Sequence, residues 1–91
     1  MAIFNLSSVI KALIDAISKA LEMIAPDQIT PEEKAMWQKY VGPVYALAKN
    51  LGPGLVESTE NDVDDAVLNE LIEVCELAAT KYGFTLDPTE L

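Results

Sequence analysis

NLSSVIKALIDAISKALEMI, residues 5–24, is the stretch around which we expect this chain to be organised. From just before this stretch to its end, apolar residues recur in alternating steps of three and four, which gathers them on one side of an α-helix. The residues of this seam are Ile3, Leu6, Ile10, Leu13, Ile17, Ala20 and Ile24. Ile14 and Leu21 lie beside the seam and widen it, whereas charged side chains occupy the opposite side. The stretch therefore predicts an amphipathic helix with a broad apolar face.

This broad face has three interpretations. The first is that it packs into the chain's own core, as the apolar side of most amphipathic helices does. The second is that it forms a seam with another chain, because alternating steps of three and four also characterise coiled-coil helices. The third is that it lies on a membrane surface, which requires that the rest of the chain leaves it uncovered.

The residues after this stretch separate the first predicted helix from a second one. Pro26 disfavours helical geometry at the residue before it, so we expect the first helix to span about residues 5–25. Thr30, Pro31 and Glu33 then form a helix start signal, with an N-cap, a proline in the first turn and a glutamate that closes a capping box. A second helix is therefore expected to begin at Pro31.

The second predicted helix contains Gly42–Pro43, where the proline removes a backbone hydrogen bond and clashes with the preceding turn. The apolar residues nevertheless keep their helical phase through this pair, and they are Trp37, Tyr40, Val41, Val44, Leu47, Ala48 and Leu51. We therefore predict one helix over residues 31–51 that is kinked at residues 42–43. The alternative is two short helices, the second starting at the proline. Gly52–Pro53–Gly54 is expected to end the element.

The third predicted helix spans about residues 62–82, with Asn61 or Asp62 as its N-cap. Its inward face is expected to consist of Val67, Leu68, Leu71, Ile72, Cys75, Ala78, Ala79 and Tyr82. Gly83 suits the left-handed conformation that commonly ends a helix. Residues 84–91 are expected to form an irregular tail.

Three long helical segments with short connections indicate an all-α fold. We predict a small antiparallel bundle of three long helices, or of four if the second helix is broken at Gly42–Pro43. The chain has 91 residues, which is the length of one domain, so residues 1–91 are treated as a single helical bundle.

The composition combines many apolar residues with a strong acidic excess. The chain is 51% hydrophobic and has a formal net charge of −9, from 6 basic and 15 acidic residues. Residues 1–30 have a net charge of −1 and residues 31–52 of +1, so the excess lies in residues 53–91, whose net charge is −9. Nucleic-acid phosphates would meet a repulsive field at such a protein. We therefore expect no direct contact with DNA or RNA.

The residue types that carry most catalysis and metal binding are scarce in this chain. It has no histidine, which removes the usual general base and zinc ligand, and a single cysteine, Cys75, on a predicted inward face. Glu60, Asp62 and Asp64 alternate as calcium ligands do, but the glycine and the final glutamate that a calcium loop needs are both missing. We therefore predict no enzymatic activity, no metal and no cofactor.

Two sets of residues are candidates for contact with a partner. The first set is an acidic stripe on the third helix, formed by Asp65, Glu70, Glu73 and Glu76. Its like charges repel weakly, so the stripe is either a solvated face or a docking surface for a basic partner. The second set is a candidate interface of residues that the other helices are not expected to cover: Ile3, Phe4, Ile14, Leu21, Met36 and Tyr45. On the second helix, Trp37 and Tyr40 are expected to lie in the core.

The sequence contains no apolar run of the roughly 20 residues that a membrane-spanning helix needs. A positively charged segment followed by a small-residue cleavage site, which would mark a secretory signal, is also missing. We therefore expect cytoplasmic synthesis without membrane attachment. If the protein is a subunit of a virus particle or another large assembly, it is incorporated there after synthesis.

The broad apolar seam and the shortage of catalytic residues favour a non-enzymatic structural or interaction protein. The expected form is a small acidic helical subunit that forms a homo-oligomer or docks into a larger assembly, such as an accessory or cement protein of a virus particle. The alternative is a soluble acidic regulator that neutralises a basic protein partner, as immunity proteins, antitoxins and nucleic-acid mimics do. Association that weakens steeply with salt would favour the alternative, and salt-insensitive self-association the first interpretation.

Overall fold

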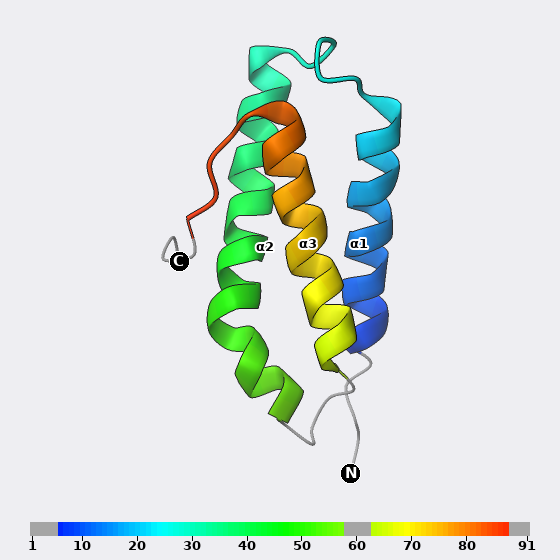
Figure 1. Cartoon of the computed structure of the whole chain (residues 1–91), viewed down its shortest axis with the longest axis vertical. Coiled ribbons are helices and arrows are strands. Elements are labelled where there is room, and N and C mark those ends of the chain that lie inside the picture. The colour runs from blue at the N-terminus through cyan, green and yellow to red at the C-terminus, as the bar shows by residue number, and fades with distance from the viewer. Residues whose placement is uncertain (1–5, 58–62, 88–91) are drawn as a thin grey trace.

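The computed structural model consists of three α-helices, α1 (Leu6–Met23), α2 (Pro31–Glu57) and α3 (Asp65–Tyr82) (Figure 1). It describes residues 6–57 and 63–87, and within these residues there is no β-strand. The chain runs up α1, down α2 and up α3, so that helices consecutive in the sequence are antiparallel (Figure 1). The prediction of an all-α bundle of three helices is confirmed.

The C-terminal end of α1 is held by side chains of α3. The last carbonyl groups of a helix have no partner within it, and Pro26 prevents α1 from continuing. The Lys81 ammonium group donates a hydrogen bond to the carbonyl oxygen of Leu21, and the Tyr82 hydroxyl donates one of 2.8 Å to that of Ile24. The ends of α1 and α3 are therefore fastened together.

The start of α2 follows the sequence signal. The backbone N–H of Glu33 donates to Oγ1 of Thr30 at 3.1 Å, and the backbone N–H of Thr30 donates to Oε1 of Glu33 at 3.1 Å. This reciprocal pair is the capping box that the sequence predicts, and it satisfies two backbone donors at the helix start.

Both internal prolines, Pro43 and Pro53, lie inside a continuous α2 that curves towards its C-terminal end (Figure 1). The alternative of four helices is therefore wrong, and so is the predicted end near residue 51, because α2 continues to Glu57. The physical reason is tertiary packing: the half-buried Leu55 and Val56 pack on the core beyond the second proline. Their burial stabilises a helical segment that local propensity disfavours.

The N-cap of α3 is Asp64, rather than the predicted Asn61 or Asp62, which lie outside the described residues. The Oδ1 atom of Asp64 accepts a hydrogen bond of 2.9 Å from the backbone N–H of Val67. Val63 is buried just before this cap and belongs to the same core cluster as Leu68, the arrangement of a hydrophobic staple. Burial of Val63 thus selects one aspartate among several as the cap.

The C-terminal end of α3 is the one that the sequence predicts. Gly83 has a φ of 72°, in the left-handed region that glycine adopts without strain. The backbone N–H groups of Gly83 and Phe84 both donate to the carbonyl oxygen of Ala79, at 2.8 and 3.0 Å. Phe84 then turns back into the core, whereas residues 84–87 form no helix, as expected for the described part of the tail.

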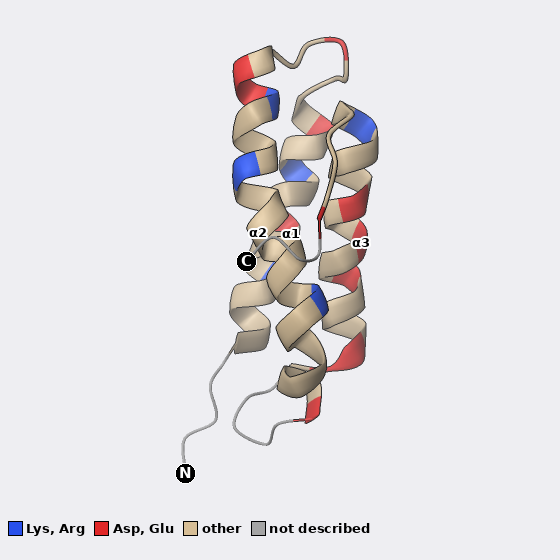
Figure 2. Cartoon of the chain, turned by 90° about the vertical axis from the view of Figure 1, so that its left-hand side faces the viewer, with Lys and Arg blue, Asp and Glu red and all other residues tan. Residues whose placement is uncertain are grey.

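The helices form two layers, with α3 in one and α1 and α2 in the other (Figures 1 and 2). Both α1 and α2 pack against α3, but they do not pack against each other. The buried core accordingly gathers around α3: Ile10, Ile14, Val41, Tyr45, Ala48, Val63, Val67, Leu68, Leu71, Val74, Cys75, Ala78, Tyr82 and Phe84. The side of α1 and α2 that faces away from α3 is left without a covering element in the described chain.

Candidate functional site

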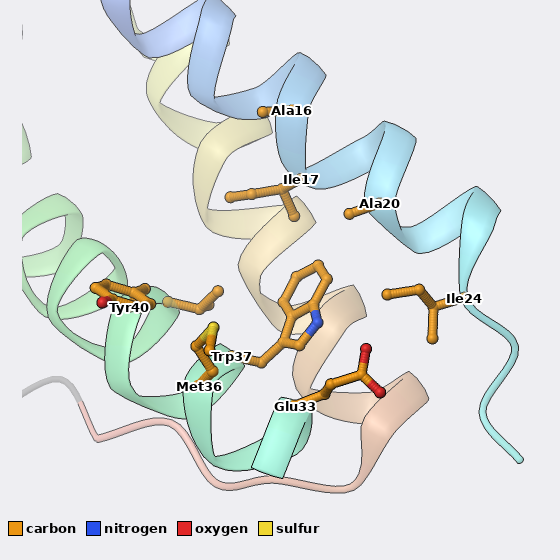
Figure 3. A pocket seen from close by; sticks show the side chains of 9 residues that line it. Ala16, Ile17, Ala20, Ile24, Glu33, Met36, Trp37 and Tyr40 are labelled. Atoms are coloured by element: carbon orange, nitrogen blue, oxygen red, sulfur yellow. The ribbon is translucent and has the colours of Figure 1, made fainter. Parts of the chain in front are cut away.

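A groove of about 380 Å³ lies between α1 and α2 near the ends that their loop connects (Figure 3). Its lining residues come from successive turns of the two antiparallel helices: Ala16, Ile17 and Ala20 from α1, with Ile24 directly after it, and Glu33, Met36, Trp37, Tyr40 and Val41 from α2. Glu33 is the one charged residue among them. The groove is therefore an almost entirely apolar hollow.

The groove residue Trp37 is held in place by a ring contact with α3. Trp37 lies between α1 and α2 (Figure 3), and its ring centroid is 5.0 Å from that of Tyr82 on α3, with the ring planes tilted by 48°. The hydroxyl of Tyr82 is anchored on the end of α1, as described above. Trp37 is half-buried by these contacts, and it is the only tryptophan of the chain.

The two walls of the groove differ in side-chain size. On the α1 side, Ile17 and Ile24 are half-buried and pack on the core, so the small residues Ala16 and Ala20 form the rim there, whereas Met36 and Tyr40 form the rim on the α2 side (Figure 3). Met36 and Tyr40 are 58% and 62% exposed, values that are high for large apolar side chains. The α1 wall is therefore low, and the α2 wall projects.

The groove lies at one end of a longer apolar surface. Along each helix, exposed apolar residues follow the wall residues in steps of three, four or seven, the spacings that keep side chains on one stripe of a helix. We call this surface the open face, and it consists of Val9, Leu13, Ala16, Ala20 and Met23 of α1 with Met36, Tyr40, Leu47 and Leu51 of α2. Apart from Leu77 on α3, every exposed large hydrophobic residue recorded in the described chain belongs to it. Contiguous exposed apolar surface of this kind marks interaction sites.

Charge is distributed unevenly between the two layers. Residues 6–57, which contain α1 and α2, carry five lysines and six acidic residues, a net charge of −1. Residues 63–87, which contain α3, carry one lysine and six acidic residues, a net charge of −5. Figure 2 shows acidic residues along α3, and both signs on α1 and α2. The open face thus belongs to the nearly neutral layer.

The candidate interface residues predicted from the sequence differ in how far they are exposed in the structure. Ile14 and Tyr45 are buried in the chain's own core, so they are corrected to core residues of the single chain. Leu21 is half-buried and packs against the core, and Met36 is exposed in the groove. Ile3 and Phe4 lie outside the described residues. Of the four that the structure describes, only Met36 therefore stands fully on the open face.

Two tyrosines of α2 exchange the roles that the sequence predicts. Tyr45 is 8% exposed, and its hydroxyl donates a hydrogen bond of 3.4 Å to Oε2 of Glu76 on α3. Tyr40, predicted in the core, is exposed in the groove. Because apolar residues cover more than half of the circumference of α2, its sequence does not define which stripe faces α3. Contact with α3 selects the stripe containing Val41 and Tyr45.

Most residues of the open face are not among the candidate interface residues that the sequence predicts. These residues are Val9, Leu13, Ala16, Ala20, Met23, Tyr40, Leu47 and Leu51, of which Leu13 and Ala20 belong to the predicted apolar seam. The sequence does contain a second apolar stripe on each helix. Val9, Ala16 and Met23 of α1 are seven residues apart, and so are Tyr40 and Leu47 of α2. This stripe lies beside the core stripe on each helix, and only the arrangement of the helices shows that it stays uncovered.

The acidic stripe lies on the exposed side of α3. Asp65, Glu70, Glu73 and Glu76 are all exposed, and no lysine of the described chain is within ion-pair distance of them. The stripe is therefore open to solvent and on a different surface from the groove.

The residues with reactive groups are placed for structure rather than for chemistry. Cys75 is fully buried, and burial, followed by the nearby Glu76 carboxylate, raises the pKa of its thiol to about 11, the opposite of what a nucleophile needs. Burial, followed by the Glu33 carboxylate, also raises the pKa of the Tyr82 hydroxyl. Residues 6–57 and 63–87 contain no group of three or more side chains placed to hold a metal ion. None of the helices described is long and apolar enough to cross a membrane.

Comparison of the chain with protein-family models, with curated proteins and with solved structures finds no match. The geometry and chemistry of the open face are consequently the features that indicate a function.

Proposed function

We propose that this protein is a non-enzymatic interaction subunit that associates through the open face, either with copies of itself or within a larger assembly. The observation that carries the proposal is the concentration of exposed large apolar side chains along one side of α1 and α2. A cement or accessory subunit of a particle is one form that such a protein takes.

The physical basis of the proposal is the apolar surface that remains in contact with water. Burying apolar surface contributes about 25 cal/mol per Å², so removing several exposed leucine, methionine and tyrosine side chains from water gives a substantial driving force for association. The groove adds a concave site in which a projecting side chain makes contacts on more than one side. The shortage of charge within it means that little desolvation opposes binding.

The test uses two matched substitutions, Leu47→Glu on the open face and Leu77→Glu outside it. Both leucines are exposed on the single chain, at 45% and 55%, so neither substitution is expected to unfold it. Native mass is measured by light scattering over a range of protein concentrations, together with the fluorescence of Trp37. We expect the mass of the unmodified protein to rise with concentration and the Trp37 emission to shift to shorter wavelength, because association covers the groove.

The Leu47→Glu variant is expected to lose both effects, since it places a charge in the apolar contact. The Leu77→Glu variant is expected to keep them. Association with unchanged Trp37 emission, or equal loss in both variants, would place the contact on another surface and contradict the proposal. A monomer at all concentrations would remove the self-associating form.

The second candidate function is the acidic regulator of a basic partner, and the exposure of the four carboxylates on α3 favours it. Its distinguishing property is salt dependence, because contacts between exposed charges are screened at high ionic strength. Binding to a basic polypeptide such as polylysine should then weaken steeply as salt increases, and it should weaken further in Glu73→Gln. Association through the open face should be nearly independent of salt.

A further inference from the structure

Given the proposed function, we infer that the occupant of the open face is the open face of a second copy of this chain. The two copies are related by a two-fold axis parallel to the helices, so that α1 of each copy packs on α2 of the other. The central part of the dimer is then a bundle of four helices, with one α3 layer on each outer side.

The size difference between the groove walls supports this arrangement. Because α1 and α2 are antiparallel, Ala20 stands at about the height of Met36, and Ala16 at about the height of Tyr40, as the lining of the groove shows (Figure 3). A two-fold axis along the helices keeps each residue at its height and exchanges the two walls. It therefore places the projecting Met36 and Tyr40 of one copy over the low alanine wall of the other, which is the close fit that helix packing needs.

An axis across the helices gives a poorer fit. With the axis at the height of the groove, it would place Met36 and Tyr40 of one copy against those of the other, and Ala16 and Ala20 against Ala16 and Ala20. At the groove, large residues are paired with small ones in only one of the two face-to-face arrangements.

The charge distribution favours contact between two copies through their open faces over contact through α3. Two layers with a net charge of −1 each meet in the middle, and the two layers with a net charge of −5 are kept apart on the outside. With helix layers about 8–10 Å apart, the two α3 layers are separated by three such steps, roughly 25–30 Å. That distance exceeds the Debye length of about 8 Å at physiological salt, so their repulsion is largely screened. Contact through α3 would instead bring the acidic layers together.

The rims of the open face have mixed charge, which two identical surfaces tolerate. Lys19 forms an ion pair of 3.1 Å with Asp15 on the outer side of α1, and Lys39 lies 5.8 Å from the ring centroid of Tyr40 on α2. These rims carry no excess of one charge that would attract a strongly basic or strongly acidic partner. A second copy carries the same mixture of positive and negative side chains.

The experiment asks which helices meet. Two single-cysteine additions are made in the full chain, Ala20→Cys on α1 and Met36→Cys on α2, and one variant carries a tag that changes its mass. The two proteins are mixed and oxidised with diamide, and the products are separated by mass without reductant. Cys75 is 0% exposed and serves as an internal check, because the unmodified protein should give no disulfide-linked dimer.

The expected main product is the mixed dimer of Ala20→Cys with Met36→Cys. In a matched control, Thr80→Cys on the exposed side of α3 is mixed with Met36→Cys and should give little mixed product. Circular dichroism checks that each variant keeps its helices.

Three results would overturn the inference. If Met36→Cys mainly links to itself, α2 faces α2 and the axis runs across the helices. In a second case, the native mass shows a dimer and the Trp37 emission shifts to shorter wavelength, but neither the mixed disulfide nor the Met36→Cys disulfide forms. The copies then meet in another arrangement, and association through the open face stands. If the protein stays monomeric at high concentration, the second copy is excluded as the occupant, and the Leu47→Glu comparison decides separately between the open face and other surfaces for a different partner.

Discussion

At the scale of single residues, Cys75 shows how burial removes reactivity. The thiol sits on the side of α3 that faces the core, where its side chain has no exposed surface. Desolvation disfavours the thiolate there, and the neighbouring Glu76 carboxylate adds repulsion. The prediction that this cysteine is a small core residue is confirmed.

The buried thiol predicts a specific loss of stability in alkaline solution. The pKa of Cys75 rises from 9.0 to about 11 in the folded protein, so the folded state holds the thiol proton more tightly than the unfolded state. The stability from this group is complete below about pH 9 and is lost as the pH rises through 11. One pKa unit corresponds to about 1.4 kcal/mol, so the loss amounts to about 2–3 kcal/mol.

Urea denaturation of the unmodified protein and of Cys75→Ala, between pH 7 and pH 11, measures this effect. The pKa of Tyr82 is also raised by burial, so both proteins should lose some stability in alkaline solution. The unmodified protein should lose more, and the difference between the two should follow the thiol. Equal slopes in the two proteins would show that the thiol is not desolvated.

At the scale of helices, α2 depends on α3 in its last turns. Gly52 and Gly54 flank Pro53 inside α2, yet their surroundings differ. A Cβ atom at Gly52 would lie 2.6 Å from Cδ2 and 2.7 Å from Cδ1 of Leu68, whereas nothing lies within 4 Å of one at Gly54. The first glycine lets α2 approach α3 closely, and the second does not contact another element.

This contrast predicts opposite effects of the same substitution. Gly52→Ala should destabilise the protein by about 1–3 kcal/mol, because Leu68 is buried in the core and has little room to move. Gly54→Ala should stabilise it by about 0.5–1 kcal/mol, because alanine loses less backbone entropy than glycine on forming a helix. Thermal unfolding of the two variants measures the difference. Stabilisation by both substitutions would mean that α2 does not pack closely on α3 at this point.

At the scale of the whole molecule, the separation of charge between layers sets the response to salt. The α3 layer has a net charge of −5 in the described residues, and its exposed carboxylates repel one another along the helix. Added salt screens this repulsion, so raising the concentration of NaCl should raise the unfolding temperature.

A matched pair of substitutions tests where this repulsion originates. Glu73→Gln removes a charge from the middle of the acidic stripe and should stabilise the protein by a few tenths of a kcal/mol while reducing its dependence on salt. Glu22→Gln removes the same charge from the nearly neutral layer and should change little. Thermal unfolding at low and high salt gives both values. If the two substitutions act equally, the repulsion is a property of the total charge and not of the α3 layer.

The sequence by itself determined the elements that depend on local chemistry. The capping box of Thr30 and Glu33, the stop at Pro26 and the left-handed Gly83 act through neighbouring backbone groups, so their residues alone identify them. The all-α class followed from apolar periodicity for the same reason. The acidic stripe also lies on an exposed face of α3, because four carboxylates are costly to bury.

Only the tertiary structure decided which apolar residues are covered. Leu68 and the core beside it keep α2 helical beyond Pro53, a long-range effect that local signals do not contain. The choice between Tyr40 and Tyr45, and the open face itself, depend on α1 and α2 packing on α3 without packing on each other. The apolar surface of α1 and of α2 is wide enough to contact two neighbouring elements. In the single chain each helix contacts α3 with one part of this surface, and the other part stays exposed.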